Sequence, residues 1–189
     1  GFDSKGDFRV TCIVGLVQDG EVWMGCDQQA TGWNNQFDVE TKLLRKGDFL
    51  FATCGTPLPR QLISHHMSPP VARDLDDPEK YLVLYLIPEM KKVFKQHGCL
   101  KLENSVESVP NCAMLVEYKN RLFNLYSNFQ VMEDIRNYHA FGTGEEYALG
   151  SLHTTERYDF SAKDRVRLAG EAAIANCPTV GGDIKVMKL

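Results

Sequence analysis

Three side chains of different chemical types stand where apolar, strand-like segments begin or end. Thr11 opens the first such segment, Asp27 lies in GCDQQAT at the end of the second, and Lys42 opens a third. A threonine hydroxyl is a weak nucleophile unless a base takes its proton, and a carboxylate can hold an ammonium group by a charge-assisted hydrogen bond. The three residues are therefore candidates for nucleophilic chemistry. The alternatives are that Thr11 is an ordinary β-branched strand residue and that Asp27 and Lys42 form a structural ion pair.

Metal, nucleic-acid and membrane chemistry find no support in the sequence. No CxxC pair occurs, and the adjacent His65 and His66 would point apart on a strand or helix, so we expect no metal and no cofactor. The net charge is −4 and no Lys/Arg-rich block stands out, which argues against a nucleic-acid partner. No stretch approaches the roughly 18 apolar residues of a membrane span, so we expect no membrane partner either.

Length and composition predict one globular domain. The chain has 189 residues, of which 43% are hydrophobic and 24% charged, enough to bury a core without disulfides. Most of its six cysteines lie in apolar stretches, where a thiol behaves as a small hydrophobe, so we expect them to be reduced and the protein to be cytoplasmic. Residues 1–10 lack the pattern of a secretory signal. We interpret them as an N-terminal extension or propeptide-like arm that precedes a single domain, 11–189.

Turn residues divide the first quarter of the chain into strands. Residues 11–26 form two β-rich runs around Asp19-Gly20, the strongest short hairpin signal in a sequence. A polar stretch follows, and the run from Lys42 continues through a turn at 46–48 into a buried strand at 49–54. The pattern therefore predicts four strands before the first helix.

Helix signals bracket the middle of the chain. Pro57 and Pro59 suit the first turn of a short helix, and a second helix is predicted from Asp77, its N-cap, to His97. Pro88 lies inside this second apolar stripe and should kink or divide the helix.

The second half repeats the sequence of strands and then helices. Strands are expected at 111–118, 121–128 and 139–141, followed by a break at Gly142-Thr143-Gly144. Helices are expected at 145–155 and 162–176, the latter capped by Ser161, before a closing strand. This order favours an α+β fold, with antiparallel sheets packed between helices, over repeated βαβ units.

These motifs, taken in order, resemble the proteasome β-subunit family of N-terminal-nucleophile hydrolases, most closely its bacterial HslV-type branch. The likeness spans essentially 11–189, although 64–109 match only as a helical stretch. It implies a four-layer αββα sandwich that assembles into rings. The matching residues are Thr11, Ile13, Val14, Asp27, Gln29, Ala30, Thr31, Lys42, Gly55, Thr56, the 142–144 break and Gly181-Gly182.

The resemblance assigns a role to each of these positions. Thr11 would be the nucleophile and its own free α-amino group the base, so Thr11 must become a chain N-terminus. Lys42, held by Asp27, would stabilise the developing alkoxide, and the backbone N–H of Gly55 would bind the oxyanion. For Gly55 the alternative is a tight turn.

Three further positions have roles at the edge of the site. Ala30 and Thr31 would form the strand edge that pairs with an extended peptide substrate. Thr143 occupies the position of a family serine, and the alternative for it is a simple turn hydroxyl.

Two departures from the family pattern argue against catalysis. Val10, which precedes Thr11, is β-branched and should hinder self-cleavage at this bond. Cys177 and Val180 stand where many relatives place an Asp and a Ser that support the nucleophile's amine, and neither can accept a hydrogen bond as a carboxylate does.

Two functional hypotheses follow from the resemblance. The first is a threonine peptidase that cleaves peptides or unfolded proteins inside a homo-oligomeric ring or a mixed assembly, with an ATPase unfoldase as a candidate partner. The second is a catalytically silent structural subunit of a larger assembly that keeps residues 1–10. A hydrolase of small amides would also need an N-terminal Thr11. Ring size, cleavage preference and the identity of the partners stay open at this stage.

Overall fold

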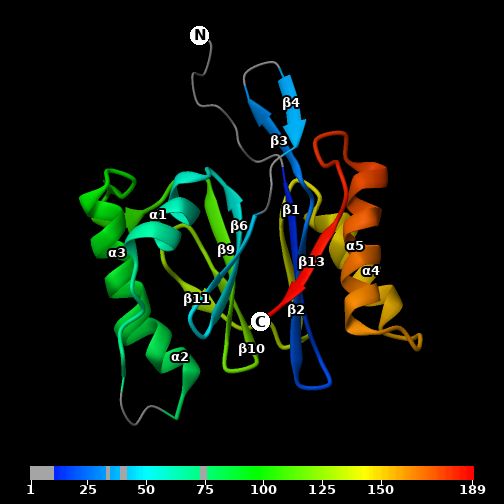
Figure 1. The fold of residues 1–189 in the computed structure, drawn as a ribbon, viewed down its shortest axis with the longest axis horizontal. Coiled ribbons are helices and arrows are strands. Elements are labelled where there is room, and N and C mark those ends of the chain that lie inside the picture. Colours follow the sequence, from blue (N-terminus) through cyan, green and yellow to red (C-terminus); the bar gives the residue numbers. More distant parts are fainter. Residues whose placement is uncertain (1–10, 33–34, 39–41, 73–75) are drawn as a thin grey trace.

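The computed structural model describes residues 11–32, 35–38, 42–72 and 76–189. Its centre consists of two antiparallel sheets lying face to face (Figure 1). One sheet has the strand order β12-β1-β2-β13 and the other the order β11-β10-β9-β6-β5. The strands of the first sheet are β1 (Cys12–Gln18), β2 (Glu21–Cys26), β12 (Tyr138–Gly142) and β13 (Lys185–Lys188). Those of the second are β5 (Leu43–Lys46), β6 (Phe49–Gly55), β9 (Cys112–Tyr118), β10 (Arg121–Leu125) and β11 (Val131–Met132).

Helices cover the outer face of each sheet (Figure 1). The five-stranded sheet carries α1 (Leu58–His66), α2 (Pro78–Tyr81), the π-helical segment η1 (Leu82–Leu86) and α3 (Ile87–Gln96). The four-stranded sheet carries α4 (Glu145–Thr155) and α5 (Ala162–Asn176). The predicted four-layer αββα sandwich is therefore confirmed.

Side-chain alternation along the strands builds three apolar cores between these four layers. On β1, Ile13 faces the opposite sheet, whereas Val14 and Leu16 face α4 and α5. On β6, Phe51 packs under α1 and α3, whereas Leu50 and Ala52 lie between the sheets. Successive residues of a strand point to opposite faces, so continuously apolar strands are what two doubly covered sheets require.

Local turn and cap signals were predicted correctly. Asp19 and Gly20 both have positive φ, 53° and 75°, as a two-residue type I′ hairpin turn requires. The Asp77 side chain accepts a hydrogen bond from the Glu79 N–H, and Ser161 accepts one from Asp164, so both residues cap the helices that follow them.

Pro88 changes the hydrogen bonding of the long middle helix without ending it. The backbone N–H of Ile87 donates to the carbonyl of Leu82, five residues earlier, at the end of η1. A proline has no N–H to donate and its ring crowds the preceding turn, and a wider π-helical turn accommodates both effects. The predicted division of this helix is thus present as the π-helical segment ahead of Pro88.

Two short hairpins were missed by the sequence analysis. β3 (Gln29–Gly32) pairs with β4 (Asn35–Asp38), a hairpin that was not predicted although Ala30 and Thr31 were expected at a strand edge. Six strands of the described residues precede the first helix, so the prediction of four was wrong. β7 (Lys101–Glu103) pairs with β8 (Val106–Ser108) in a region expected to be helical. β7 is exposed along its whole length, so no alternation of buried and exposed residues marks it in the sequence.

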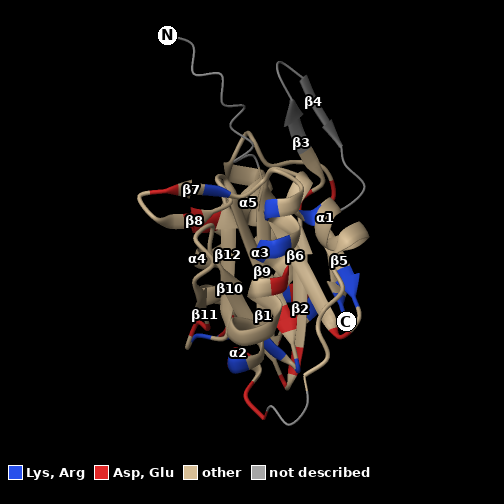
Figure 2. Ribbon diagram, turned by 90° about the vertical axis from the view of Figure 1, so that its left-hand side faces the viewer, with Lys and Arg blue, Asp and Glu red and all other residues tan. Residues whose placement is uncertain are grey.

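The six cysteines are all free, and five of them are buried. No helix in the described part of the chain is both long and apolar enough to span a bilayer. Lys and Arg as well as Asp and Glu are scattered over the ribbon (Figure 2). Residues 1–10, interpreted above as an arm, lie outside the described ranges.

Candidate active site

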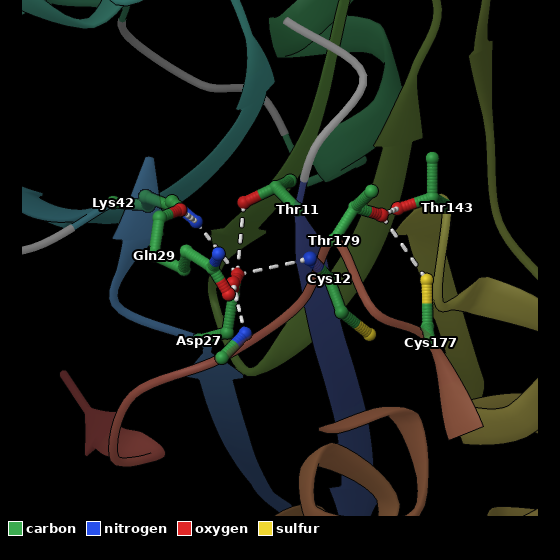
Figure 3. Close-up of polar contacts among 9 residues, drawn as sticks. Thr11, Cys12, Asp27, Gln29, Lys42, Thr143, Cys177 and Thr179 are labelled. Atoms are coloured by element: carbon green, nitrogen blue, oxygen red, sulfur yellow. Dashed lines mark hydrogen bonds and ion pairs between the residues drawn. The ribbon is translucent and has the colours of Figure 1, made fainter. Parts of the chain in front are cut away.

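Asp27 is the centre of the site. Its side chain is fully buried, with 0% exposure. Oδ1 accepts hydrogen bonds from Thr11 Oγ1 at 2.9 Å, from the Cys12 N–H at 3.0 Å and from Lys42 Nζ at 2.6 Å (Figure 3). The backbone N–H of Gly181 donates to Oδ2 at 3.3 Å. A buried carboxylate needs such partners, and these include the predicted nucleophile and the predicted cation.

Strand pairing explains why Thr11 meets Asp27. β1 and β2 form the hairpin of the Asp19-Gly20 turn, and Ile13 lies opposite Cys26 in their register. The residues just beyond each strand, Thr11 and Asp27, therefore share one end of the sheet, where the Asp27 N–H also donates to the Cys12 carbonyl at 3.2 Å. The Thr11 side chain is only 2% exposed.

Lys42 reaches this end from the other sheet. Its backbone carbonyl accepts the Thr53 N–H at 3.0 Å, which holds Lys42 at the start of β5 beside β6. Besides Asp27, its ammonium group donates to the carbonyl of Gln29 at 2.7 Å. The lysine side chain is 13% exposed, so the ion pair is mostly shielded from water.

Gly55 ends β6 with φ +102°, and a Cβ here would lie 1.6 Å from the Asn111 carbonyl oxygen. The positive φ and this close approach agree with the turn interpretation of Gly55. The Thr53 N–H points toward β5, and N–H directions alternate along a strand, so the Gly55 N–H points toward the Lys42 side. This direction is compatible with the predicted oxyanion role.

Two further glycines fit tightly around the site, and their roles were not predicted. A Cβ on Gly142, which has φ +109°, would lie 1.9 Å from the Thr11 carbonyl oxygen. A Cβ on Gly181 would lie 2.1 Å from Oε1 of Gln29. In the sequence both positions had been identified only as a break between elements or as part of the family resemblance. Their closeness to Thr11 and Gln29 depends on strands distant in the sequence.

Thr143 belongs to a small hydroxyl and thiol cluster. Its Oγ1 lies 3.0 Å from Thr179 Oγ1, which in turn lies 3.2 Å from Cys177 Sγ (Figure 3). Burial pushes the pKa of the Cys177 thiol upward, but hydrogen bonds with the Thr179 and Thr143 hydroxyls outweigh burial and hold this pKa below its usual value. Sequence analysis identified Thr143 and Cys177 but missed Thr179, which links them.

Solved structures of similar architecture place this geometry in context. BPH from Thiobacillus denitrificans, solved in complex with epoxomicin, has a TM-score of 0.75 at 21% identity and covers 95% of this chain and 98% of its own. Eukaryotic HslV from Trypanosoma brucei has a TM-score of 0.66 at 15% identity, and the match covers 95% of this chain and 99% of the HslV chain. Anbu, the ancestral beta-subunit, from Yersinia bercovieri has a TM-score of 0.68 at 15% identity, and the match covers 94% of this chain and 81% of the Anbu chain.

The chain has the proteasome-type fold. The resemblance seen in the sequence is thereby confirmed at the level of the fold. Comparison with protein-family models and with curated proteins finds no match.

In this proteasome-type fold the predicted substrate edge is β3. Ala30 lies opposite Phe37 and Thr31 opposite Gln36 in the β3–β4 hairpin. β3 begins at Gln29, the residue whose carbonyl contacts Lys42, so the edge starts next to the ion pair. The peptide-binding role of Ala30 and Thr31 remains a prediction.

A cleft of about 610 Å³ opens at the same end of the sandwich. Gly55 and Gly142 both line it, as do Thr143 and the first residues of α4, Glu145 and Glu146. Gly142 also packs against the Thr11 carbonyl, so the cleft borders the candidate nucleophile. The sequence carried no signal for this cleft, because its walls come from separate segments of the chain.

Proposed function

We propose that this chain is a subunit of a proteasome-type peptidase in which Thr11, once it is the first residue, attacks peptide bonds. One observation carries the proposal: a single buried oxygen, Oδ1 of Asp27, accepts both the Thr11 hydroxyl and the Lys42 ammonium group. This arrangement joins a nucleophile and a cation at the edge of a cleft large enough for peptide side chains.

The proposed reaction has two steps. The free α-amine of Thr11 takes the proton of its own hydroxyl while Oγ1 bonds to the substrate carbonyl carbon. The carbonyl oxygen becomes an oxyanion that accepts the Gly55 N–H, and the positive charge of Lys42 lowers the energy of this negatively charged state. Collapse breaks the C–N bond, and the departing amine receives the proton. Water then hydrolyses the Thr11 ester and restores the hydroxyl.

The remaining parts of the proposal concern processing and context. Residues 1–10 are an arm that must be removed, and 11–189 form the working domain. The substrates are peptides or unfolded proteins, the active form is an oligomeric ring in the cytoplasm, and an ATPase unfoldase is a candidate partner. No cofactor is required by this chemistry.

The proposal is tested by intact mass and by a covalent probe. Purified, assembled protein should include a species whose mass begins at Thr11. This species should be labelled on Thr11 by a threonine-directed epoxyketone. Thr11→Val keeps the size of the side chain but removes the hydroxyl, so it should abolish labelling and hydrolysis. A processed protein that neither labels nor cleaves any peptide in a diverse library would contradict the proposal.

A second function, a silent structural subunit, is favoured by one specific set of contacts. Beside Thr11 the structure has the Thr143, Thr179 and Cys177 cluster, with no carboxylate among these three residues to hold a free amine. Val10, which precedes Thr11 and should hinder self-cleavage, also favours this second function. In this case the mature assembly would retain residues 1–10 in its mass, would form a ring by native mass spectrometry, and would not label.

A further inference from the structure

The cleft beside Thr11 lies on the side away from the predicted substrate edge. In Figure 3, Lys42 and Gln29 lie on one side of Thr11, and Thr143 lies on the other. β3 begins at Gln29, whereas Thr143 is part of the cleft wall. A peptide that runs along β3 and passes the nucleophile would therefore continue into the cleft.

The charged side chains that line the cleft are acidic. Glu145, half-buried, and Glu146, exposed, are the charged residues among the described residues that line it, and no described Lys or Arg does so. Neither carboxylate forms a hydrogen bond or an ion pair within the described part of the chain. At Cys54, a residue of the same wall, burial is the largest influence and raises the pKa of the thiol, the charge of Lys42 lowers this pKa, and the charge of Glu145 raises it. Two carboxylates without an ion-pair partner among the described residues thus line this cleft.

Two packed aromatic rings form an apolar part of the cleft wall. Tyr126 and Phe141 form an edge-to-face pair with ring centroids 5.4 Å apart and an interplanar angle of 89°. Phe141 is buried in the core between the sheets, and Tyr126 packs against that core. Lysine and arginine side chains combine an aliphatic stem with a charged head, which matches an apolar wall that ends at carboxylates.

We propose that this cleft selects a lysine or arginine side chain in the residue that follows the scissile bond. The inference rests on the proposed peptidase function, with the peptide segment before the scissile bond paired to β3 and the segment after it entering the cleft. The stem of the basic side chain lies against Tyr126 and Phe141, and its charged head reaches Glu145 and Glu146. A glutamate at the same substrate position would meet two like charges in a partly shielded site and would be rejected.

Binding to the assembled Thr11→Ala protein tests the proposal without requiring turnover. Three end-blocked peptides that differ only at this position, carrying Lys, Ala or Glu, are compared by fluorescence anisotropy. The Lys peptide should bind roughly 5-fold more tightly than the Ala peptide, as expected for a partly exposed ion pair, and the Glu peptide most weakly. Raising the salt concentration should reduce these differences.

Matched variants separate the cleft from general charge effects. Glu145→Gln together with Glu146→Gln should remove the preference for Lys. Glu156→Gln removes the same type of charge from the other end of α4, roughly 16 Å away at 1.5 Å per residue, and should leave the preference intact. Equal binding of the three peptides, or a preference that survives the double substitution, would overturn the proposal.

Cleavage by the processed protein distinguishes this inference from the proposed function. Product sequencing of a peptide library should show Lys and Arg enriched just after the cut. The double substitution should lower the ratio of kcat/KM for these substrates to kcat/KM for Ala substrates several-fold. Absence of hydrolysis together with the binding preference would contradict the peptidase function but support the cleft. Hydrolysis without a preference for Lys or Arg would support the peptidase function and contradict the proposed role of the cleft.

Discussion

The ammonium group of Lys42 lies 2.6 Å from Oδ1 of Asp27, and the same oxygen accepts the Thr11 hydroxyl at 2.9 Å. The lysine charge and the candidate nucleophile are thus joined through one atom. Residues that are 15 and 16 positions from Asp27 in the sequence meet there because each ends or begins a strand at the same edge. A substitution of Thr11, Asp27 or Lys42 should therefore alter the hydrogen bonding of the other two residues.

Replacing Lys42 should damage stability as well as chemistry. Lys42→Met removes the cation and leaves a buried carboxylate without its ion-pair partner, for which we expect a loss of about 3 kcal/mol in the free energy of unfolding. Denaturant unfolding measures this loss. Lys95→Met, an exposed lysine on α3, is the control and should change stability by less than about 0.5 kcal/mol. Equal effects of the two variants would show that the Asp27 pair is not stabilising.

Gly142 should tolerate no side chain. Gly142→Ala would place Cβ 1.9 Å from the Thr11 carbonyl oxygen at a backbone φ of +109°, so we expect a loss of at least about 2 kcal/mol. Gly150, inside α4, has no neighbouring atom within 4 Å of the point that a Cβ would occupy, so Gly150→Ala should be neutral or stabilising by up to about 1 kcal/mol. Thermal unfolding of both variants measures the difference. A stable Gly142→Ala protein would mean that Thr11 can move away from β12.

Glu117 should make stability depend on pH. Burial raises the pKa of this carboxyl to about 7, although the nearby charge of Lys188 lowers it. The Oε1 atom of Glu117 is buried and has no hydrogen-bond partner. The raised pKa means that the native state holds the proton more tightly than the unfolded chain. The contribution of Glu117 is therefore fully present below pH 4.5 and declines as the pH rises toward 7.

Substitution of Glu117 by Gln isolates this effect. Between pH 4.5 and 7.5, the free energy of unfolding of the wild-type protein should fall by about 2–3 kcal/mol relative to that of Glu117→Gln. Urea unfolding at several pH values measures both proteins. Glu103→Gln, on the exposed strand β7, is the control and should follow the wild-type curve. Parallel curves for wild type and Glu117→Gln would contradict the raised pKa.

Cys177 should be the most reactive thiol of the chain. Its pKa is held below the usual value by the threonine hydroxyls, whereas burial raises the pKa of Cys12, Cys54 and Cys112. The thiolate is the reacting form, so limited alkylation with iodoacetamide near pH 7.5 should modify Cys177 first, as read by peptide mass spectrometry.

Removing the hydrogen bond from Thr179 tests the cause of this reactivity. Thr179→Val should slow alkylation of Cys177 several-fold, because it removes one of the hydroxyls that stabilise the thiolate. Thr154→Val, at an exposed position of α4, should leave the rate unchanged. Faster labelling of Cys99 than of Cys177 would show that access to the thiol outweighs its pKa.

Several features of this protein were predictable from the sequence because they depend on neighbouring residues. The Asp19-Gly20 turn, the Asp77 and Ser161 caps and the disturbance at Pro88 follow from local backbone preferences. The order of strands and helices along the chain predicted antiparallel sheets packed between helices. The resemblance to proteasome subunits added the register that places Thr11, Asp27 and Lys42 together.

Other features were decided only by the tertiary structure. Gly181 donates to Asp27 from 154 residues away, Thr179 links Thr143 to Cys177, and separate segments build the cleft. The missed β3 and β7 hairpins are short, and β7 is exposed, so little periodic burial marks them in the sequence. Local preference determines how a segment bends, whereas the packing of distant strands determines which polar groups share one buried oxygen and which walls enclose a cleft.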